Sequence, residues 1–168
     1  MDYELKNKLH VITHELDATS HVAKIAELKI QHTHSITAIP SELAEPLEDY
    51  NCVMFALDLV ARLENPCRPL GRFYADTEFL SVLISKEILK ESTNEVGKII
   101  VWSDEEKIKH VGLVSGKDVA KSKWGIGNLY EHGFQEVPES YGSNLTFFEP
   151  INGELALEML SRFLAREL

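Results

Sequence analysis

Residues 96–124 hold three short apolar runs joined by connections that are too tight for a crossover helix. The runs are residues 98–102, 109–116 and 119–124, with the polar turn SDEEK after the first and GKD after the second. All three contain the β-branched and aromatic residues typical of strands. Parallel strands need a connection of a dozen or more residues, so this pattern predicts an antiparallel meander. The run around Phe147 is a candidate for a fourth strand.

Helical patterns flank this meander on both sides. Apolar residues recur at helical spacing through residues 3–31, and the segment DATS from Asp17 to Ser20 offers a new cap that divides them into two helices. Further helices are predicted over residues 52–63, 76–90 and 153–168, and a connector with two prolines over residues 31–50. Helices come first, strands follow and a helix ends the chain, so the fold class is α+β.

Composition excludes several classes of function. The net charge of −10 and the pI near 5.1 argue against binding to a nucleic-acid backbone. No apolar stretch approaches the ~20 residues that cross a membrane, and the polar N-terminus does not resemble a secretory signal. The two cysteines do not indicate a disulfide framework. We therefore expect a cytoplasmic protein, with export by a specialised route left open.

Cys52 lies where the most apolar helical pattern begins, in the stretch DYNCVMFAL. Asp49 or Asn51 is the expected cap of this helix. Free N–H groups at a helix start favour an anion, which lowers the pKa of a thiol, and they can also hold the oxyanion of a tetrahedral intermediate. The alternative is that Cys52 is a small apolar residue that opens a core helix.

A nucleophilic thiol needs a base from elsewhere in the fold. His110 is the candidate, because it begins the apolar run HVGLV and is therefore expected on a strand of the sheet. Five of the other histidines lie within residues 10–34, and His132 follows the meander.

These segments resemble the core of the NlpC-type cysteine peptidases and amidases, which belong to the papain-like superfamily. The similarity rests on YNCVMFAL, then GKIIVW, then HVGLVSG and a third strand, over roughly residues 48–125. The resemblance implies a helix that carries the nucleophile, packed on a small antiparallel sheet that carries the base. It looks like an uncharacterised bacterial side branch of that superfamily.

The resemblance also implies the roles of individual residues. Cys52 would be the nucleophile and His110 the base, and Asn51 stands where the family has an aspartate. A third polar residue orients the base from about twelve positions further along the chain, which is Ser122 here. His132 is the alternative for that role. Lys123 and Trp124 are further pocket candidates.

The implied function is that of a thiol-dependent hydrolase or acyltransferase acting on an amide in a peptide, a peptidoglycan-type stem or a protein side chain. It needs no cofactor. The alternative is a weak or inactive papain-like scaffold that acts as a binding or regulatory module. The chain would form one domain over residues 1–168, with a helical extension over 1–40, the papain-like core over 41–150 and a closing helix over 151–168. The oligomeric state stays open.

Two other sets of residues were considered as sites. His10, His14 and His21 share a helical face, and because that face lies opposite the apolar one we expect it to be exposed and bind no metal. Cys67 lies in the proline-bounded segment NPCRP without a helix start, so we expect an incidental or structural thiol. Lys121 and Lys123 would share one face of an edge strand and keep it soluble.

Overall fold

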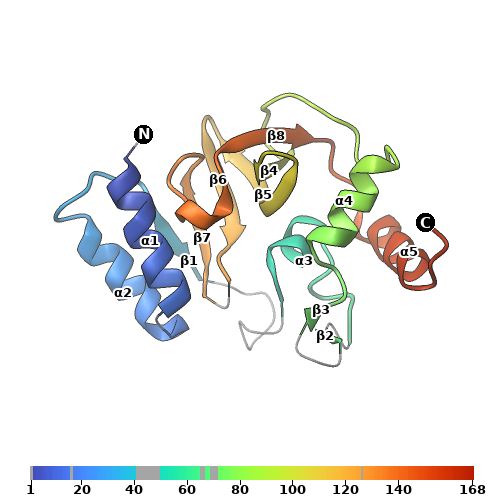
Figure 1. Ribbon diagram of the computed structural model, residues 1–168, viewed down its shortest axis with the longest axis horizontal. Helices are drawn as coiled ribbons and strands as arrows, with labels where there is room; N and C mark the ends of the chain where they lie inside the picture. Colours follow the sequence, from blue (N-terminus) through green and yellow to red (C-terminus); the bar gives the residue numbers. More distant parts are fainter. Residues whose placement is uncertain (1, 16, 41–49, 65–66, 69–71, 126) are drawn as a thin grey trace.

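The fold of the chain was analysed in a computed structural model, which describes residues 2–15, 17–40, 50–64, 67–68, 72–125 and 127–168. Within those ranges the protein is an α+β fold of three layers, with helices on both faces of a central sheet (Figure 1). The helices are α1 (Tyr3–Glu15), α2 (Ala18–Leu28), α3 (Cys52–Ala56), α4 (Thr77–Ser85) and α5 (Gly153–Leu164). The first two lie on one face, and the other three lie on the opposite face.

The central sheet has six antiparallel strands in the order β1-β7-β6-β5-β4-β8. The strands are β1 (Thr37–Ile39), β4 (Ile99–Asp104), β5 (Lys107–Gly116), β6 (Val119–Lys123), β7 (Leu129–Gly133) and β8 (Asn144–Phe148). The predicted meander is confirmed as β4, β5 and β6, and the candidate fourth strand is β8, which pairs with β4. A separate two-stranded sheet joins β2 (Cys67–Arg68) to β3 (Arg72–Phe73).

The two strands at the other side of the sheet were not predicted. β1 lies inside the segment assigned as a connector, and β7 pairs with β6 along all five of its residues. Both are short, and each forms because a neighbouring strand offers a ladder of backbone partners. Strand formation of this kind depends on tertiary context more than on local composition.

The N-terminal helical pattern does divide at Asp17, whose carboxylate accepts the N–H of Ser20 at 3.2 Å. Because α2 starts in a new direction, the apolar face of the first helix does not continue onto the second. Ile30, at the end of the predicted apolar pattern, is 87% exposed, and His21 is fully buried although it was expected in solvent. The prediction of an exposed histidine face is therefore wrong for His21.

The helix predicted over residues 52–63 is also wrong in length, because α3 ends at Ala56. Asp58 has φ of 54°, a left-handed conformation that cannot continue a right-handed helix. The start of α5 packs against this point, since a Cβ atom on Gly153 would lie 2.5 Å from the Asp58 carbonyl oxygen. The helix predicted over residues 76–90 ends early as well, at Ser85, two residues before the left-handed Glu87.

The sheet separates two apolar cores. Along β4, Ile99 and Val101 face α3, α4 and α5, whereas Ile100 and Trp102 face α1 and α2. Successive side chains of a strand point to opposite faces, so β4 is buried on both of its faces. α5 begins where it was predicted, with Asn152 as its cap and one buried face, but it ends at Leu164 and not at residue 168.

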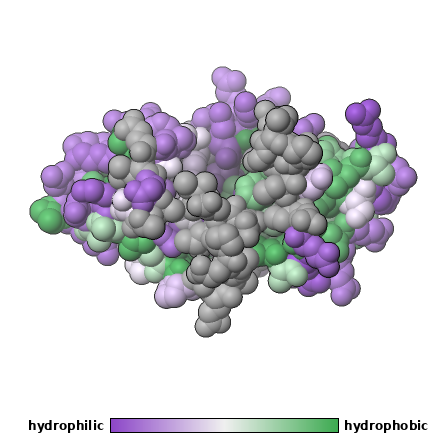
Figure 2. Space-filling model, turned by 90° about the horizontal axis from the view of Figure 1, so that it is seen from below, coloured by the Kyte–Doolittle hydropathy of each residue, from purple (hydrophilic) through white to green (hydrophobic). Residues whose placement is uncertain are grey.

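The outer surface combines charged and apolar residues. Figure 2 shows hydrophilic residues spread towards both ends of the lower face, and apolar residues gathered on the side where α5 lies. In the part of the chain that the structure describes, no helix is both long enough and apolar enough to cross a membrane.

Gly112 is required where β5 meets β6, and its replacement should destabilise the fold. A Cβ atom there would lie 2.6 Å from the Lys121 carbonyl oxygen and 2.8 Å from the Ser122 Cβ. We expect Gly112→Ala to lower the free energy of unfolding by about 1–3 kcal/mol, as overpacking does. Urea denaturation measures this change.

The matched control is Gly116→Ala in the same strand. Its Cβ would meet the nearest atom at 3.6 Å, an ordinary contact, so this variant should differ little from the wild type. Equal effects of the two substitutions would contradict the close approach at Gly112.

Candidate active site

The site lies where β5 and β6 cease to pair. The last pair between them is Leu113↔Lys121. Beyond it, Ser122 and Lys123 of β6 pair with β7 but not with β5. Successive residues of a strand direct their N–H groups to opposite neighbours. The Val114 N–H points to the β4 side, where it donates to the Lys98 carbonyl, so the Val111 N–H points to the β6 side. On that side it lies near the Cys52 thiol, whose pKa it lowers.

Cys52 is the first residue of α3 and is half-buried. Asn51 caps this helix, as one of the two predicted alternatives, and its Oδ1 accepts the Met54 N–H at 2.9 Å. Its Nδ2 donates to the Ala75 carbonyl at 2.8 Å, which ties the helix start to the segment before α4. Asp49, the other candidate cap, lies outside the described residues. Both ends of the Asn51 amide therefore hold the position of the thiol.

The pKa of the Cys52 thiol is set by two opposing effects. Burial raises the pKa, whereas the N–H groups of Val111, Val53 and Cys52 itself, together with the Lys123 ammonium, lower it. Burial is the larger effect, so the pKa lies above its ordinary value, contrary to the sequence-based expectation. A helix of only five residues supplies the N–H groups of its first turn but little further dipole. The resting thiol is therefore protonated at neutral pH.

His110 lies on β5 next to Val111, whose main-chain N–H is near enough to the Cys52 thiol to lower its pKa. The ring is 2% exposed and stacks on Tyr141 at 3.9 Å between centroids. Its Nε2 is buried and has no hydrogen-bond partner among the residues that the structure describes. Burial, with a smaller contribution from His132, places the pKa of His110 well below its ordinary value. His110 is therefore a neutral imidazole with a free ring nitrogen.

Ser122 and His132 form a hydrogen bond with each other. The Ser122 Oγ lies 2.8 Å from the His132 Nε2 and accepts the Trp124 Nε1–H at 3.0 Å. His132 Nδ1 lies 2.9 Å from the Gly133 carbonyl, so the network assigns the proton to Nδ1 and the Ser122 hydroxyl proton to the bond with Nε2. Within the described ranges, neither Ser122 nor His132 forms a hydrogen bond to His110.

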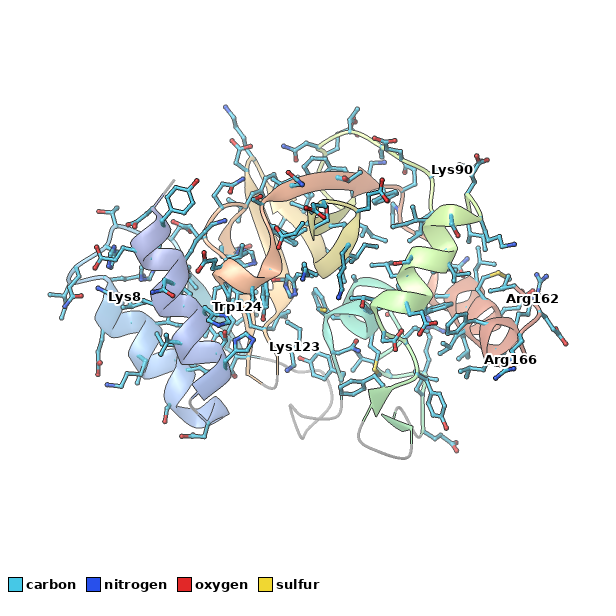
Figure 3. All side chains as sticks on the ribbon, in the orientation of Figure 1. Lys8, Lys90, Lys123, Trp124, Arg162 and Arg166 are labelled. Atoms are coloured by element: carbon cyan, nitrogen blue, oxygen red, sulfur yellow. The ribbon has the colours of Figure 1, made fainter. Side chains whose placement is uncertain are left out.

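Lys123 is fully buried, and the prediction that it shares an exposed face with Lys121 is wrong. The reason is that β6 is an internal strand, with neighbours on both sides. The Lys123 Nζ donates to the Gly125 carbonyl at 2.7 Å and lies 5.0 Å from the centre of the Tyr50 ring. Figure 3 shows Lys123 between the end of the sheet and α3, and Trp124 on the side of α1.

Tyr141 was missed by the sequence analysis. It lies in the short 3-10 helix η2 (Glu139–Tyr141), where its ring stacks on the His110 ring. Burial raises the pKa of Tyr141, and its charge interaction with Cys52 acts in the same direction. The segment ESYG carries no motif that links it to His110, so only the folded chain reveals this contact.

No group of three or more histidine, cysteine or acidic residues in the described ranges is arranged to hold a metal ion. His10 and His14 lie together on α1, with ring centres 4.1 Å apart. His21 is buried on α2, where a Cβ atom on Gly127 would collide with its ring. The main chain of Cys67 belongs to β2 and not to a helix start.

The chain was compared with known proteins. A family model described as a domain of unknown function (DUF7689) matches residues 42–149, more than half of the chain. The chain therefore belongs to this family. Its matched region includes Cys52, His110, Ser122, Lys123, His132 and Tyr141, so the candidate catalytic and supporting residues fall inside it. Neither a curated protein nor a solved structure matches the chain.

The buried neutral His132 should make stability depend on pH. Its pKa is lowered from 6.5 to about 4, chiefly by burial, so the unfolded chain binds a proton that the folded chain does not between these values. This contribution to stability is fully present above pH 6.5 and is lost as the pH falls towards about 4, a change of about 3 kcal/mol. Urea denaturation of the wild type and of His132→Gln near pH 7.5 and near pH 4.5 measures it.

His132→Gln removes the titrating group and keeps an oxygen that can accept the Ser122 hydroxyl. The wild type should lose more stability than this variant between the two pH values, even though carboxylates titrate in both. An equal loss in both proteins would mean that His132 is not held neutral by the fold.

Proposed function

We propose that the protein is a thiol-dependent hydrolase or acyltransferase of papain-like, NlpC type that acts on an amide. One observation carries the proposal: α3, which begins with Cys52, packs against β5, which carries His110, and the Val111 N–H beside His110 lowers the pKa of the Cys52 thiol. The buried Nε2 of His110 has no partner in the described part of the chain. A nucleophilic thiol needs a base, and the unpartnered imidazole of His110 lies on the strand next to the helix that carries Cys52.

The proposed reaction begins from the neutral pair. His110 takes the proton of Cys52 as the sulfur attacks the carbonyl carbon, so a C–S bond forms and the carbonyl π electrons move to oxygen. Burial opposes each isolated charge, but a thiolate and an imidazolium formed together stabilise each other. The Lys123 ammonium lowers the cost of the negative charge. Main-chain N–H groups at the sulfur are placed to stabilise charge as it develops.

The tetrahedral intermediate then collapses. The C–N bond breaks as His110 returns its proton to the leaving nitrogen, which leaves a thioester on Cys52. Water or a second amine attacks that thioester, His110 accepts the proton of the attacking group, and the sulfur departs with the electron pair of the C–S bond. The choice between water and an amine decides between hydrolysis and transfer. The net charge of −10 favours a peptide-like substrate over a nucleic acid.

Ser122 fits a positioning role better than direct contact with His110. With His132 and Trp124 it forms a buried hydrogen-bonded layer, and Gly112 lies directly over the Ser122 Cβ. This layer packs against β5 at Gly112, two residues from His110. Tyr141 supports the ring from the other side through their stacking contact.

The second candidate function is a weak or inactive papain-like scaffold that serves as a binding or regulatory module. It is favoured by the direction of the two pKa shifts, since burial raises the pKa of Cys52 and lowers that of His110. Both shifts disfavour the charged pair that a strongly activated cysteine enzyme holds at rest. The two candidates differ in whether Cys52 can be acylated.

Acylation by p-nitrophenyl acetate tests the proposal. We expect one acetyl group on Cys52 of the wild type, found by peptide mass spectrometry, and a matching release of p-nitrophenolate. His110→Ala should slow this release by about 10²–10⁴-fold, the usual contribution of a general base. Cys52→Ala should abolish it.

Cys67→Ser is the control for the second thiol and should react as the wild type does. His110→Gln, which is closer in size to histidine, guards against a folding defect in His110→Ala. Acetylation spread over lysines and Cys67, with none on Cys52, would leave only the binding module.

A further inference from the structure

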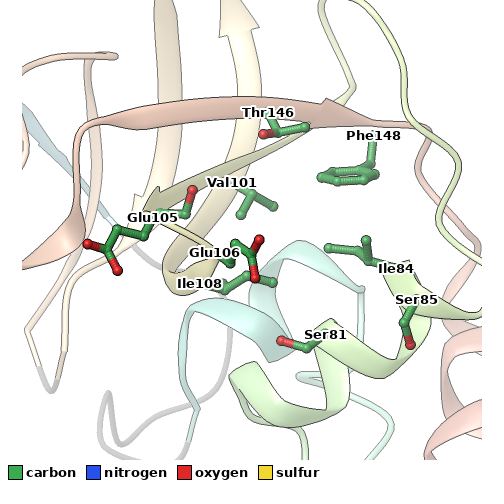
Figure 4. A pocket seen from close by; sticks show the side chains of 10 residues that line it. Ser81, Ile84, Ser85, Val101, Glu105, Glu106, Ile108, Thr146 and Phe148 are labelled. Atoms are coloured by element: carbon green, nitrogen blue, oxygen red, sulfur yellow. The ribbon is translucent and has the colours of Figure 1, made fainter.

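A groove runs between α4 and the β4–β5 hairpin, on the same side of the sheet as α3. Figure 4 shows its central hollow, of about 310 Å³, lined by residues of α4, of the hairpin and of β8. A second hollow of about 490 Å³ shares Ser81, Glu105, Glu106 and Ile108 with it, so the two are continuous.

The floor of the groove is apolar and its hairpin rim is acidic. Ile84, Val101, Ile108 and Phe148 form the floor, with serine and threonine hydroxyl groups at its edges. The mixture is typical of a site that orients a ligand through a few polar groups over an apolar base.

Glu78, Glu105 and Glu106 line the groove, and all three are exposed. Within the described ranges, none of these carboxylates forms an ion pair, and Lys107 is the cation that lines the same hollow. Three carboxylates against one ammonium leave a negative potential over an apolar floor. A long basic side chain complements both features, because its methylene stem covers apolar surface while its charge stays in water at the rim.

The groove is close to the thiol along β5. Ile108 lines the groove, and Val111, three residues on, is the residue whose N–H lies near the Cys52 thiol. At ~3.3 Å per residue this interval spans roughly 10 Å, or about three residues of an extended peptide. Ile108 and Cys52 also pack against the same apolar core.

We infer that this groove is a recognition subsite for a lysine or arginine of a polypeptide substrate, about three residues from the amide that Cys52 attacks. The inference rests on the proposed function, because that function supplies the amide. The basic stem would lie on Ile84 and Val101, and its charge would lie at Glu105 and Glu106.

Peptide binding to full-length Cys52→Ala tests the subsite without any reaction. The probes are fluorescein-labelled peptides of about eight alanine and leucine residues, long enough at ~3.3 Å per residue to span groove and thiol. One carries a central lysine and its counterpart carries glutamine there. We expect anisotropy titrations to give at least about tenfold tighter binding of the lysine peptide, weakened by salt.

The preference should disappear in Glu105→Asn/Glu106→Gln. Asparagine is chosen because Glu105 has φ of 52°, which asparagine tolerates. The control Glu158→Gln/Glu167→Gln removes two exposed charges from α5 and the C-terminal end, outside the groove, and should keep the preference. Equal binding of the two peptides, or equal weakening by both double variants, overturns the subsite.

Protection of the thiol tests the link between groove and Cys52. In the wild type, saturating lysine peptide should slow modification of Cys52 by N-ethylmaleimide by about tenfold, because the bound chain covers the sulfur. Lysine-peptide binding without protection overturns the link. If Cys52 is acetylated but no lysine preference is found, the subsite alone fails. If the preference is found but Cys52 is never acylated, the proposed function fails and the groove remains a binding site.

Discussion

The approach of the Val111 N–H to the Cys52 thiol positions the candidate site. It exists because β5 and β6 part before the end of β6, which leaves a strand N–H without a strand partner. A buried N–H without a partner is costly, and the thiol that fills this position is held by the Asn51 cap. The same parting of the strands brings the start of α3 to the level of His110. The geometry of the candidate site therefore depends on one opening in the sheet.

Behind that opening lies a layer of buried polar and aromatic side chains that stays neutral. His110 stacks on Tyr141, and Ser122 joins Trp124 to His132. Burial lowers the pKa of both histidines and raises that of the tyrosine, so these three side chains are uncharged at rest. Lys123 is the neighbouring cation, and its charge lowers the pKa of Cys52. The site is thus arranged for a proton to move between neutral partners when a substrate arrives.

The sequence predicted what local periodicity and tight turns determine. The meander, a helix cap at Asp49 or Asn51 and the break at Asp17 follow from residue types at short range, and the fold class follows from their order. The short α3, the strands β1 and β7 and the burial of Lys123 depend on contacts between distant segments. At the site, Cys52 and His110 could be named from their local patterns. Tyr141 could not, and the bonding of Ser122 to His132 requires β6 and β7 to be neighbours, which no local pattern indicates.

The most direct test of the central claim is the rate at which iodoacetamide alkylates Cys52 across the pH range, in the wild type and in His110→Gln. A thiol with a raised pKa reacts faster as the pH rises through that pKa, and this limb should be present in both proteins. If His110 accepts the proton of Cys52, the wild type should react about tenfold or more faster than the variant near neutral pH, where the isolated thiol is protonated. Two profiles that superimpose over the whole range would contradict the pairing of Cys52 with His110.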